Sequence, residues 1–205
     1  MMKRIITAII VLCALCGMTA NAQLRYGLTG GVSINNLKFS QELIQVDREV
    51  GFSAGGVAEY MFPGIGFAID FGLMYSQRGA TLHLGEKEVW ASDGFGTERS
   101  YLHCVEIPIN LRFKYHRLNG FEDYLAPFIF AGPSISFLAG HNDISALDYN
   151  GAEVGLQVGA GVEIFKNFQL SGCRNWGMTN TLQTKKLDNF YARNRSWNIR
   201  LAYFF

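Results

Sequence analysis

Apolar and polar side chains alternate along much of the chain, and the alternation is clearest over residues 101–115. There the odd positions are apolar apart from one histidine, and they are Tyr101, His103, Val105, Ile107, Ile109, Leu111, Phe113 and Tyr115. The even positions carry every charge of the segment, namely Glu106, Arg112 and Lys114. A period of two predicts a β-strand with one apolar and one polar face. Residues 196–205 repeat the pattern.

Six further segments follow the same period with more exceptions. They cover residues 24–36, 51–61, 66–77, 124–138, 152–165 and 168–176. Segment 124–138 is apolar on both faces, so the side that it turns inward stays open. Segments of this length suit tilted strands that cross a bilayer. The pattern therefore predicts an all-β chain of eight strands, and it is compatible with an eight-stranded antiparallel transmembrane β-barrel.

Alternation alone does not separate a barrel in lipid from a soluble β-sandwich, whose apolar faces pack inside. Aromatic residues near the segment ends favour the barrel, because membrane barrels carry such residues at both lipid–water interfaces. The aromatics expected at these interfaces are Tyr26, Tyr60, Tyr75, Tyr101, Tyr115, Trp176, Trp197 and Tyr203. The apolar face of the last segment is interpreted as a C-terminal signal for barrel assembly, made by Trp197, Ile199, Leu201, Tyr203 and Phe205.

The lengths of the connections also favour the membrane barrel. About 14, 21, 13 and 18 residues follow the first, third, fifth and seventh segments, whereas residues 62–65, 116–123 and 166–167 form the connections between them. Long outer loops and short periplasmic turns are the arrangement of outer-membrane barrels. We therefore expect a bacterial outer-membrane protein with both termini in the periplasm, and a secreted soluble β-domain is the alternative.

The polar face of these segments should form a paired network inside the barrel. It holds Arg25, Glu59, Asp70, Glu106, Arg112, Lys114, Glu153, Glu163 and Arg200. Four cations against five anions nearly cancel, and an unpaired carboxylate such as Glu106 would be costly inside. Eight strands enclose room for little more than their own side chains, so we do not expect a diffusive pore. Arg174 falls on the apolar face, either at the headgroup level or turned inward by a bulge near Gly172.

The first residues have the form of a secretory signal peptide. Lys3 and Arg4 precede an apolar run over residues 5–15, and Ala20 and Ala22 precede Gln23. Small residues at these two positions match a cleavage site, and the apolar run is too short to span a membrane as a helix. We expect a signal peptide over residues 1–22 and a barrel domain over residues 23–205, with a first helix of the fold as the alternative.

Composition adds few groups that could carry chemistry. The 205 residues, with 14% aromatic residues, 23 glycines and 4 prolines, suit one β-rich domain. Loss of the signal peptide turns the formal charge of +1 into −1, which gives no basis for nucleic-acid binding. Cys104 and Cys173 have no second cysteine or histidine at metal-ligand spacing. We expect free buried thiols and neither a metal nor a cofactor.

Four stretches of the chain resemble the PorT-like outer-membrane barrels, a group with the small eight-stranded OmpA/OmpX-type architecture. The matching stretches are residues 72–80, 105–113, 127–134 and 197–205. The resemblance covers essentially the whole mature chain and implies its fold and location. The namesake of the group implies an accessory role in the type IX secretion system. The stretches are strand and turn elements, so no catalytic or binding residue is transferred from the family.

Catalysis would have to come from the expected outer loops. The second loop contains His83, Ser92 and Asp93, and the third contains His141 and Asp143. Some small outer-membrane barrels are enzymes that use such residues at the outer rim. No spacing ties these residues together, so we expect solvated loop residues and no catalytic site.

The fourth expected loop is basic. It contains Lys185, Lys186, Arg193 and Arg195 against Asp188. Arginine and lysine bind phosphate readily, so this loop could contact lipopolysaccharide. A solvated basic loop without a ligand is the alternative interpretation.

The leading functional hypothesis is a non-enzymatic outer-membrane barrel that presents its loops to a partner, as an accessory of a secretion or envelope machine. A stand-alone structural or adhesive surface barrel is the alternative, and a lipid-modifying enzyme of the outer leaflet comes third. The expected partners are outer-membrane lipid and lipopolysaccharide, the barrel-assembly machinery, and a secretion-system or surface protein.

Overall fold

The computed structural model describes residues 24–39, 45–62, 66–83, 96–115, 123–142, 147–184 and 191–205. These residues contain ten strands. Eight of them are long: β1 (Leu24–Phe39), β2 (Gln45–Met61), β3 (Phe67–His83), β4 (Thr97–Lys114), β5 (Leu125–His141), β7 (Ala152–Ile164), β8 (Phe168–Gly177) and β10 (Tyr191–Phe204). Two are short, β6 (Leu147–Tyr149) and β9 (Leu182–Thr184), and they pair with each other. Within these residues no helix is long and apolar enough to cross a membrane.

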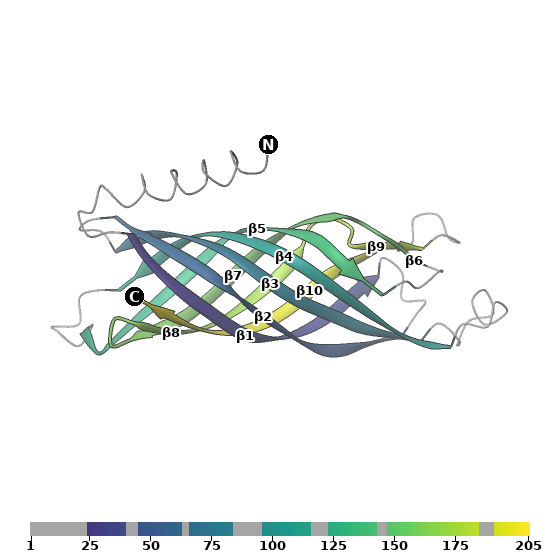
Figure 1. Cartoon of the computed structure of the whole chain (residues 1–205), viewed down its shortest axis with the longest axis horizontal. Helices are drawn as coiled ribbons and strands as arrows, with labels where there is room; N and C mark the ends of the chain where they lie inside the picture. Colours follow the sequence, from purple (N-terminus) through teal and green to yellow (C-terminus); the bar gives the residue numbers. More distant parts are fainter. Residues whose placement is uncertain are drawn as a thin grey trace, which may run out of the picture.

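The long strands form a closed barrel (Figure 1). Each pairs antiparallel with the next long strand along the chain, and β10 returns to pair with β1 from Gly27–Phe204 to Phe39–Ala192. The expected eight-stranded antiparallel β-barrel is thereby confirmed. The expected signal peptide and its cleavage site lie outside the described residues.

The predicted strand bounds fit one end of the barrel better than the other. We call the end that holds Leu24 and Phe205 the terminal end, and the opposite end, where β6 and β9 lie, the loop end (Figure 1). At the terminal end every long strand begins or ends within one residue of its predicted bound. At the loop end β1 to β5 and β10 run three to six residues further, whereas β7 and β8 stay within one residue of their predicted bounds. Only residues 40–44 separate β1 from β2.

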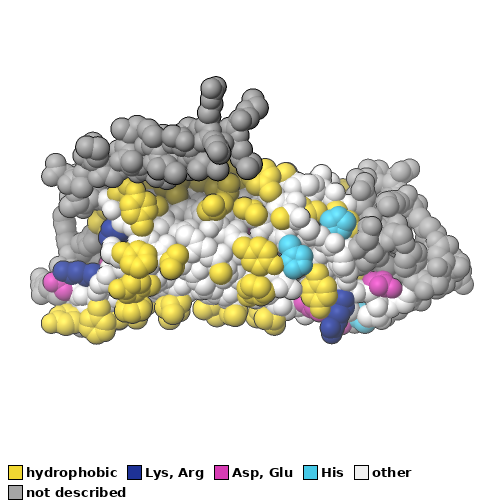
Figure 2. Space-filling view, in the orientation of Figure 1, with side chains coloured by type: hydrophobic (Ala, Val, Ile, Leu, Met, Phe, Trp, Pro, Cys, Tyr) yellow, Lys and Arg dark blue, Asp and Glu magenta, His cyan; other side chains and the backbone are white. Residues whose placement is uncertain are grey.

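The outer wall is apolar over its middle and its terminal half. Leu28, Leu73, Ile129 and Ile199 point away from the barrel and are 60–62% exposed. Figure 2 shows hydrophobic side chains over this part of one face, with histidine side chains toward the loop end and charged side chains near both ends. Exposed apolar surface of this extent fits a belt that lipid covers.

The polarity of the two faces reverses near the loop end. Leu37, Leu82 and Ala192 are buried inside the barrel, whereas Lys38 and Arg193 are exposed on its wall. Within lipid the wall has to be apolar, but beyond the lipid it faces water, and apolar side chains are then better placed inside. The reversal therefore marks the level at which the wall leaves the membrane.

Strand β5, whose facing the sequence left open, turns its even-numbered residues inward. Phe128 and Phe130 are buried, whereas Ile129 between them is exposed. The two rings lie opposite Gly161 and Gly159 of β7. A Cβ at either glycine would come within 2.5 Å of a ring carbon, so the missing side chains make room for the rings.

Gly132 of β5 lies close to the backbone of β4. A Cβ at this position would lie 2.0 Å from the carbonyl oxygen of Ile109 and 2.7 Å from the Cα of Asn110. Both are backbone atoms, so the strands would have to separate, and we expect Gly132→Ala to lower the free energy of unfolding by about 1–3 kcal/mol. Gly172→Ala is the matched control, because no atom lies within 4 Å of its Cβ position. Urea unfolding in lipid vesicles compares the two variants, and equal midpoints would contradict the prediction.

Candidate functional site

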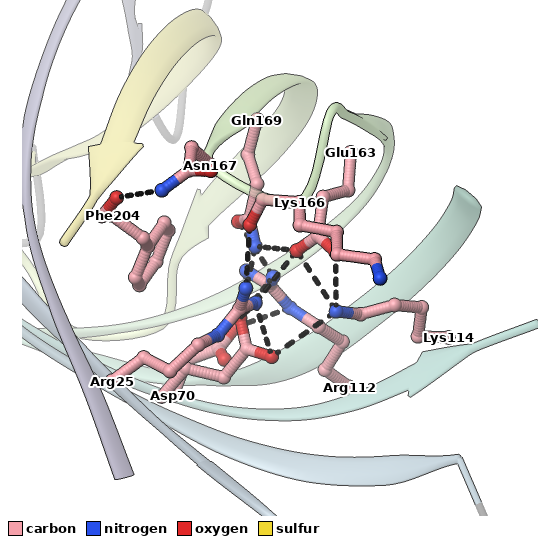
Figure 3. A network of polar contacts seen from close by, with 10 residues as sticks. Arg25, Asp70, Arg112, Lys114, Glu163, Lys166, Asn167, Gln169 and Phe204 are labelled. Carbon is pink, nitrogen blue, oxygen red and sulfur yellow. Dashed lines mark hydrogen bonds and ion pairs between the residues drawn. The ribbon is translucent and has the colours of Figure 1, made fainter. Parts of the chain in front are cut away.

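The terminal half of the interior holds a network of polar side chains, which we call the terminal cluster (Figure 3). Its members are Arg25, Glu59, Asp70, Arg112, Lys114, Glu163 and Gln169. They come from six strands of the barrel, because each sits at an inward position and the barrel is narrow. Their contacts therefore join strands that are not neighbours in the sheet.

Glu59 is the centre of the terminal cluster and is 1% exposed. Its carboxylate oxygens lie 3.0 Å from the guanidinium of Arg25, 2.9 Å from that of Arg112 and 3.5 Å from the Nζ of Lys114. The side-chain amide of Gln169 donates a further hydrogen bond of 2.9 Å to it. One carboxylate thus faces three cations.

Two more carboxylates complete the charge pairing of this cluster. Glu163 lies 2.8 Å from the Nζ of Lys114 and 2.6 Å from the guanidinium of Arg25. Asp70 accepts from Arg112, whose Nε and Nη2 lie 2.8 Å and 2.7 Å from one of its oxygens. Each cation of the cluster therefore has at least two carboxylate partners.

A second network, the central cluster, lies nearer the loop end and consists of Arg78, Glu106, Ser136, Glu153, Thr181 and Arg200. The guanidinium of Arg78 donates to Glu106 at 2.9 Å and to the Ser136 hydroxyl at 3.1 Å. It also lies 3.4 Å from Glu153. The guanidinium of Arg200 is 3.4 Å from the other oxygen of Glu106.

Each cluster is electrically neutral, with three cations and three carboxylates in the terminal cluster and two of each in the central one. All nine charged residues expected inside belong to one of the two clusters. Sequence reasoning missed Arg78 because the predicted strand ended at Gln77. Arg78 keeps the parity of Asp70 and Ser76, so extending the strand by one residue would have found the cation that balances the interior.

A small cavity remains inside the barrel between the two clusters. It has a volume of about 50 Å³, is lined in part by Asp70 and Arg200, and has space for one or two water molecules. At the terminal mouth Arg25 donates to the carbonyl oxygen of Lys166 at 2.6 Å and lies 5.0 Å from the ring centre of Phe204. The charged side chains of both clusters are thus engaged with one another.

The eight aromatics expected at the lipid interfaces all lie on the outer wall, at two levels. Those near the terminal end are Tyr26, Tyr60, Tyr115 and Tyr203, and those toward the loop end are Tyr75, Tyr101, Trp176 and Trp197. Phe67 and Phe113, which sequence reasoning did not single out, add a ring pair 5.0 Å apart at the terminal end. Ile199, Leu201 and Phe205, expected in the C-terminal assembly signal, also point outward and are exposed.

Arg174 points outward from β8. Its guanidinium carbon lies 5.3 Å from the ring centre of Trp176 and 5.0 Å from that of Trp197. The pairing of β8 with both neighbours continues without a register shift through Gly172, so the alternative of a bulge that turns Arg174 inward is wrong.

The histidines considered for catalysis make polar contacts at the loop end. The Nε2 of His83 lies 2.9 Å from the Asp47 carboxylate, and its Nδ1 lies 3.2 Å from the Thr97 hydroxyl. The side chain of Asp47 is 59% exposed, so water competes for this contact on the outer wall. His141 stacks on Tyr149 with 4.0 Å between ring centres. Ser92, Asp93 and Asp143 lie outside the described residues.

The structure describes both cysteines of the barrel and two of the basic residues expected in the fourth loop. Cys104 and Cys173 are free and buried, and the described residues include no group of three His, Cys, Asp or Glu side chains that could hold a metal ion. Arg193 and Arg195, expected in the fourth loop, lie on the wall side of β10 instead. Lys185, Lys186 and Asp188 lie outside the described residues.

Comparison with known proteins identifies a family and several solved barrels. A family model described as an outer membrane protein beta-barrel domain matches residues 19–183. No curated protein matches the chain. The crystal structure of Neisserial surface protein A is 13% identical with a TM-score of 0.50, over 88% of this chain and 97% of that one. The outer membrane protein OprG from Pseudomonas aeruginosa is 10% identical with a TM-score of 0.48, over 89% and 94%. Identities this low concern the fold alone.

Proposed function

Because the chain belongs to the outer membrane protein beta-barrel domain family, we propose that it acts as a sealed, non-enzymatic barrel that presents its loop end at the cell surface. Both termini then lie in the periplasm, and residues 1–22 act as the leader that is removed on export. The observation that carries this proposal is the neutral, ion-paired interior, in which buried cations and carboxylates fill the space that a pore or a substrate would need.

The loop end supports a role in presentation. The strands continue beyond the apolar belt with an outward polar wall and an inward apolar filling, so the barrel holds its rim rigid above the lipid. The short strands β6 and β9 add further pairing at this rim. A rigid platform of this kind loses little conformational entropy when a protein partner binds.

The partner that we infer belongs to a secretion or envelope machine of the type IX kind, since the resemblance to PorT-like barrels extends along the mature chain. Outer-membrane lipid surrounds the belt, and the barrel-assembly machinery would recognise the outward residues of β10. A stand-alone structural or adhesive barrel differs from this proposal in that it needs no secretion partner.

Deletion of the protein in its native host tests the accessory role. We expect secreted cargo to accumulate in the periplasm while the envelope stays resistant to detergents and dyes. A barrel without an open channel does not contribute to the permeability of the envelope, so its deletion should leave that permeability unchanged. Immunoblots of periplasm and medium, together with dye-uptake assays, measure both effects. Normal secretion, with a leaky or an unchanged envelope, would instead favour the structural or adhesive barrel.

Complementation then locates the partner surface. His83 and Thr97 are directly paired, so residues 84–96 can be replaced by an Asn-Gly turn without disturbing the barrel. We expect this variant to reach the membrane but not to restore secretion. A matched control shortens residues 116–122 at the terminal end and should restore it. Full rescue by both variants would contradict presentation through this loop.

A further inference from the structure

Three adjoining strands carry outward cations and no carboxylate. Strands β8, β10 and β1 are neighbours in the barrel, and none of the three contains an aspartate or a glutamate. Their outward cations lie toward the loop end and are Lys38, Arg174, Arg193 and Arg195. We call these four residues the basic wall. No carboxylate of the described residues forms an ion pair with Arg174, Arg193 or Arg195, so the basic wall is complementary to an external anion.

The basic wall begins at the level where the apolar belt ends. Arg195 is the direct cross-strand partner of Trp176, and Arg174 is that of Trp197. Tryptophan prefers the lipid–water interface, and an outward arginine costs least at that level. The guanidinium of Arg174 lies about 5 Å from both indole rings, which hold it at the wall. The cations therefore sit at the depth of lipid headgroups.

A groove in the apolar wall leads away from Arg174 toward the terminal end. It has a volume of about 840 Å³, and Gly172 and Ala160 form its floor between the larger side chains of Trp197 and Ile129. A Cβ on Gly172 would meet no atom within 4 Å, which means that the space above it is open.

The direction of the groove follows from the strand register. Gly172 pairs with Ala160, Ala160 with Ile129, Ile129 with Phe113, and Phe113 with Phe67 at the terminal end of β3. Such a row runs perpendicular to the strands, and strands of membrane barrels are tilted by roughly 35–45°. The groove therefore descends obliquely from the basic wall into the belt, the path that an acyl chain takes below its headgroup.

We propose that the basic wall and this groove bind a lipid A molecule of the outer leaflet, with a phosphate between Arg174 and Arg195 and an acyl chain over Gly172 and Ala160. Arginine forms paired, charge-assisted hydrogen bonds with phosphate oxygens. Several cations in one patch suit a lipid with more than one phosphate. The proposal rests on the orientation given under the proposed function, which turns the loop end to the cell surface.

Binding of purified lipid A to the full-length mature barrel tests the site. The protein is held in phosphocholine detergent, lipid A is added, and complexes are counted by native mass spectrometry. We expect the double variant Arg174→Gln/Arg195→Gln to weaken binding about tenfold or more, because charge-assisted hydrogen bonds are lost. Gly172→Leu should weaken binding by occupying the groove. Gly56→Leu is its matched control, since Gly56 also points outward with open space, on β2, and should leave binding unchanged.

Two other lipids identify the ligand chemistry. Dephosphorylated lipid A should bind no better to the natural protein than to the double arginine variant. Phosphatidylglycerol, which carries one phosphate, should bind more weakly than lipid A. Equal binding of lipid A by natural protein and double variant, equal loss with both leucine variants, or stronger binding of phosphatidylglycerol would each overturn the proposal.

The orientation is tested separately. Thr97 is exposed at the loop end, and the two natural cysteines of the barrel are buried. A membrane-impermeant maleimide should therefore label Thr97→Cys in intact cells. Labelling only after the outer membrane is opened would reverse the orientation and overturn both the surface role and the assignment to lipid A. Binding measured in detergent would then still report whether a phospholipid of the other leaflet occupies the groove.

Discussion

Replacing Glu59 by glutamine should lower the free energy of unfolding by about 3–5 kcal/mol, the cost of breaking a buried ion pair from one side. Glu59 faces Arg25, Arg112 and Lys114 within 3.5 Å. Without its charge the terminal cluster keeps three cations and only two carboxylates. Glutamine has nearly the same volume as glutamate, so packing is retained and the loss is electrostatic. Urea unfolding from lipid vesicles, followed by tryptophan fluorescence, measures the change.

A surface ion pair provides the control for this measurement. Lys166 and Asp123 lie 2.8 Å apart at the terminal end, and both side chains are about 60% exposed. Exposed pairs contribute about 0–1 kcal/mol, so Asp123→Asn should shift the unfolding midpoint little. If Glu59→Gln behaved like Asp123→Asn, the terminal cluster would be hydrated and the sealed interior would have to be abandoned.

Replacing Arg78 by methionine should have an effect of similar size, about 3–5 kcal/mol, through the opposite imbalance. Arg78 lies within 3.4 Å of Glu106 and Glu153, and its side chain is 4% exposed. Its removal leaves the central cluster with two carboxylates, Glu106 and Glu153, and with Arg200 as its remaining cation. Heat-dependent gel mobility and urea unfolding should both detect the loss.

Adding Glu153→Gln to Arg78→Met tests whether charge balance is the cause. The double variant restores a neutral central cluster, so it should lose less stability than the two single changes added together. Arg99→Met is the control on the outer wall, where the side chain is 67% exposed and lies 3.4 Å from Glu49. Strictly additive losses at Arg78 and Glu153 would show that the two side chains act independently.

Strand positions at the terminal end were predictable because lipid forces one face of each strand to be apolar. The strict period of β4 from Tyr101 to Lys114 is the clearest case, and its inward charges, Glu106, Arg112 and Lys114, all lie in the two clusters. The same rule failed at the loop end. There the period of two continues, but Leu37 and Leu82 point inward and their outward neighbours are polar. A criterion that requires outward apolar residues therefore ends these strands several residues too early.

Where a segment is apolar on both faces, its sequence does not show which side chains point into the barrel. In β5 the inward side is decided by Gly159 and Gly161 of the adjoining strand, which leave room for the rings of Phe130 and Phe128. That fit depends on the register between β5 and β7. A single strand does not carry this information.

The sequence by itself determined the period of the strands, the closed all-β architecture and the set of charges that lipid excludes from the wall. Only the tertiary structure decided which charges meet. Arg25 of β1 reaches Glu163 of β7, and Glu59 of β2 reaches Gln169 of β8, across the interior rather than along the sheet. It also decided that Arg174 lies between Trp176 and Trp197 above an open groove. The physical reason is that curvature and stagger set the height and direction of each side chain, and both follow from how the strands pair and close.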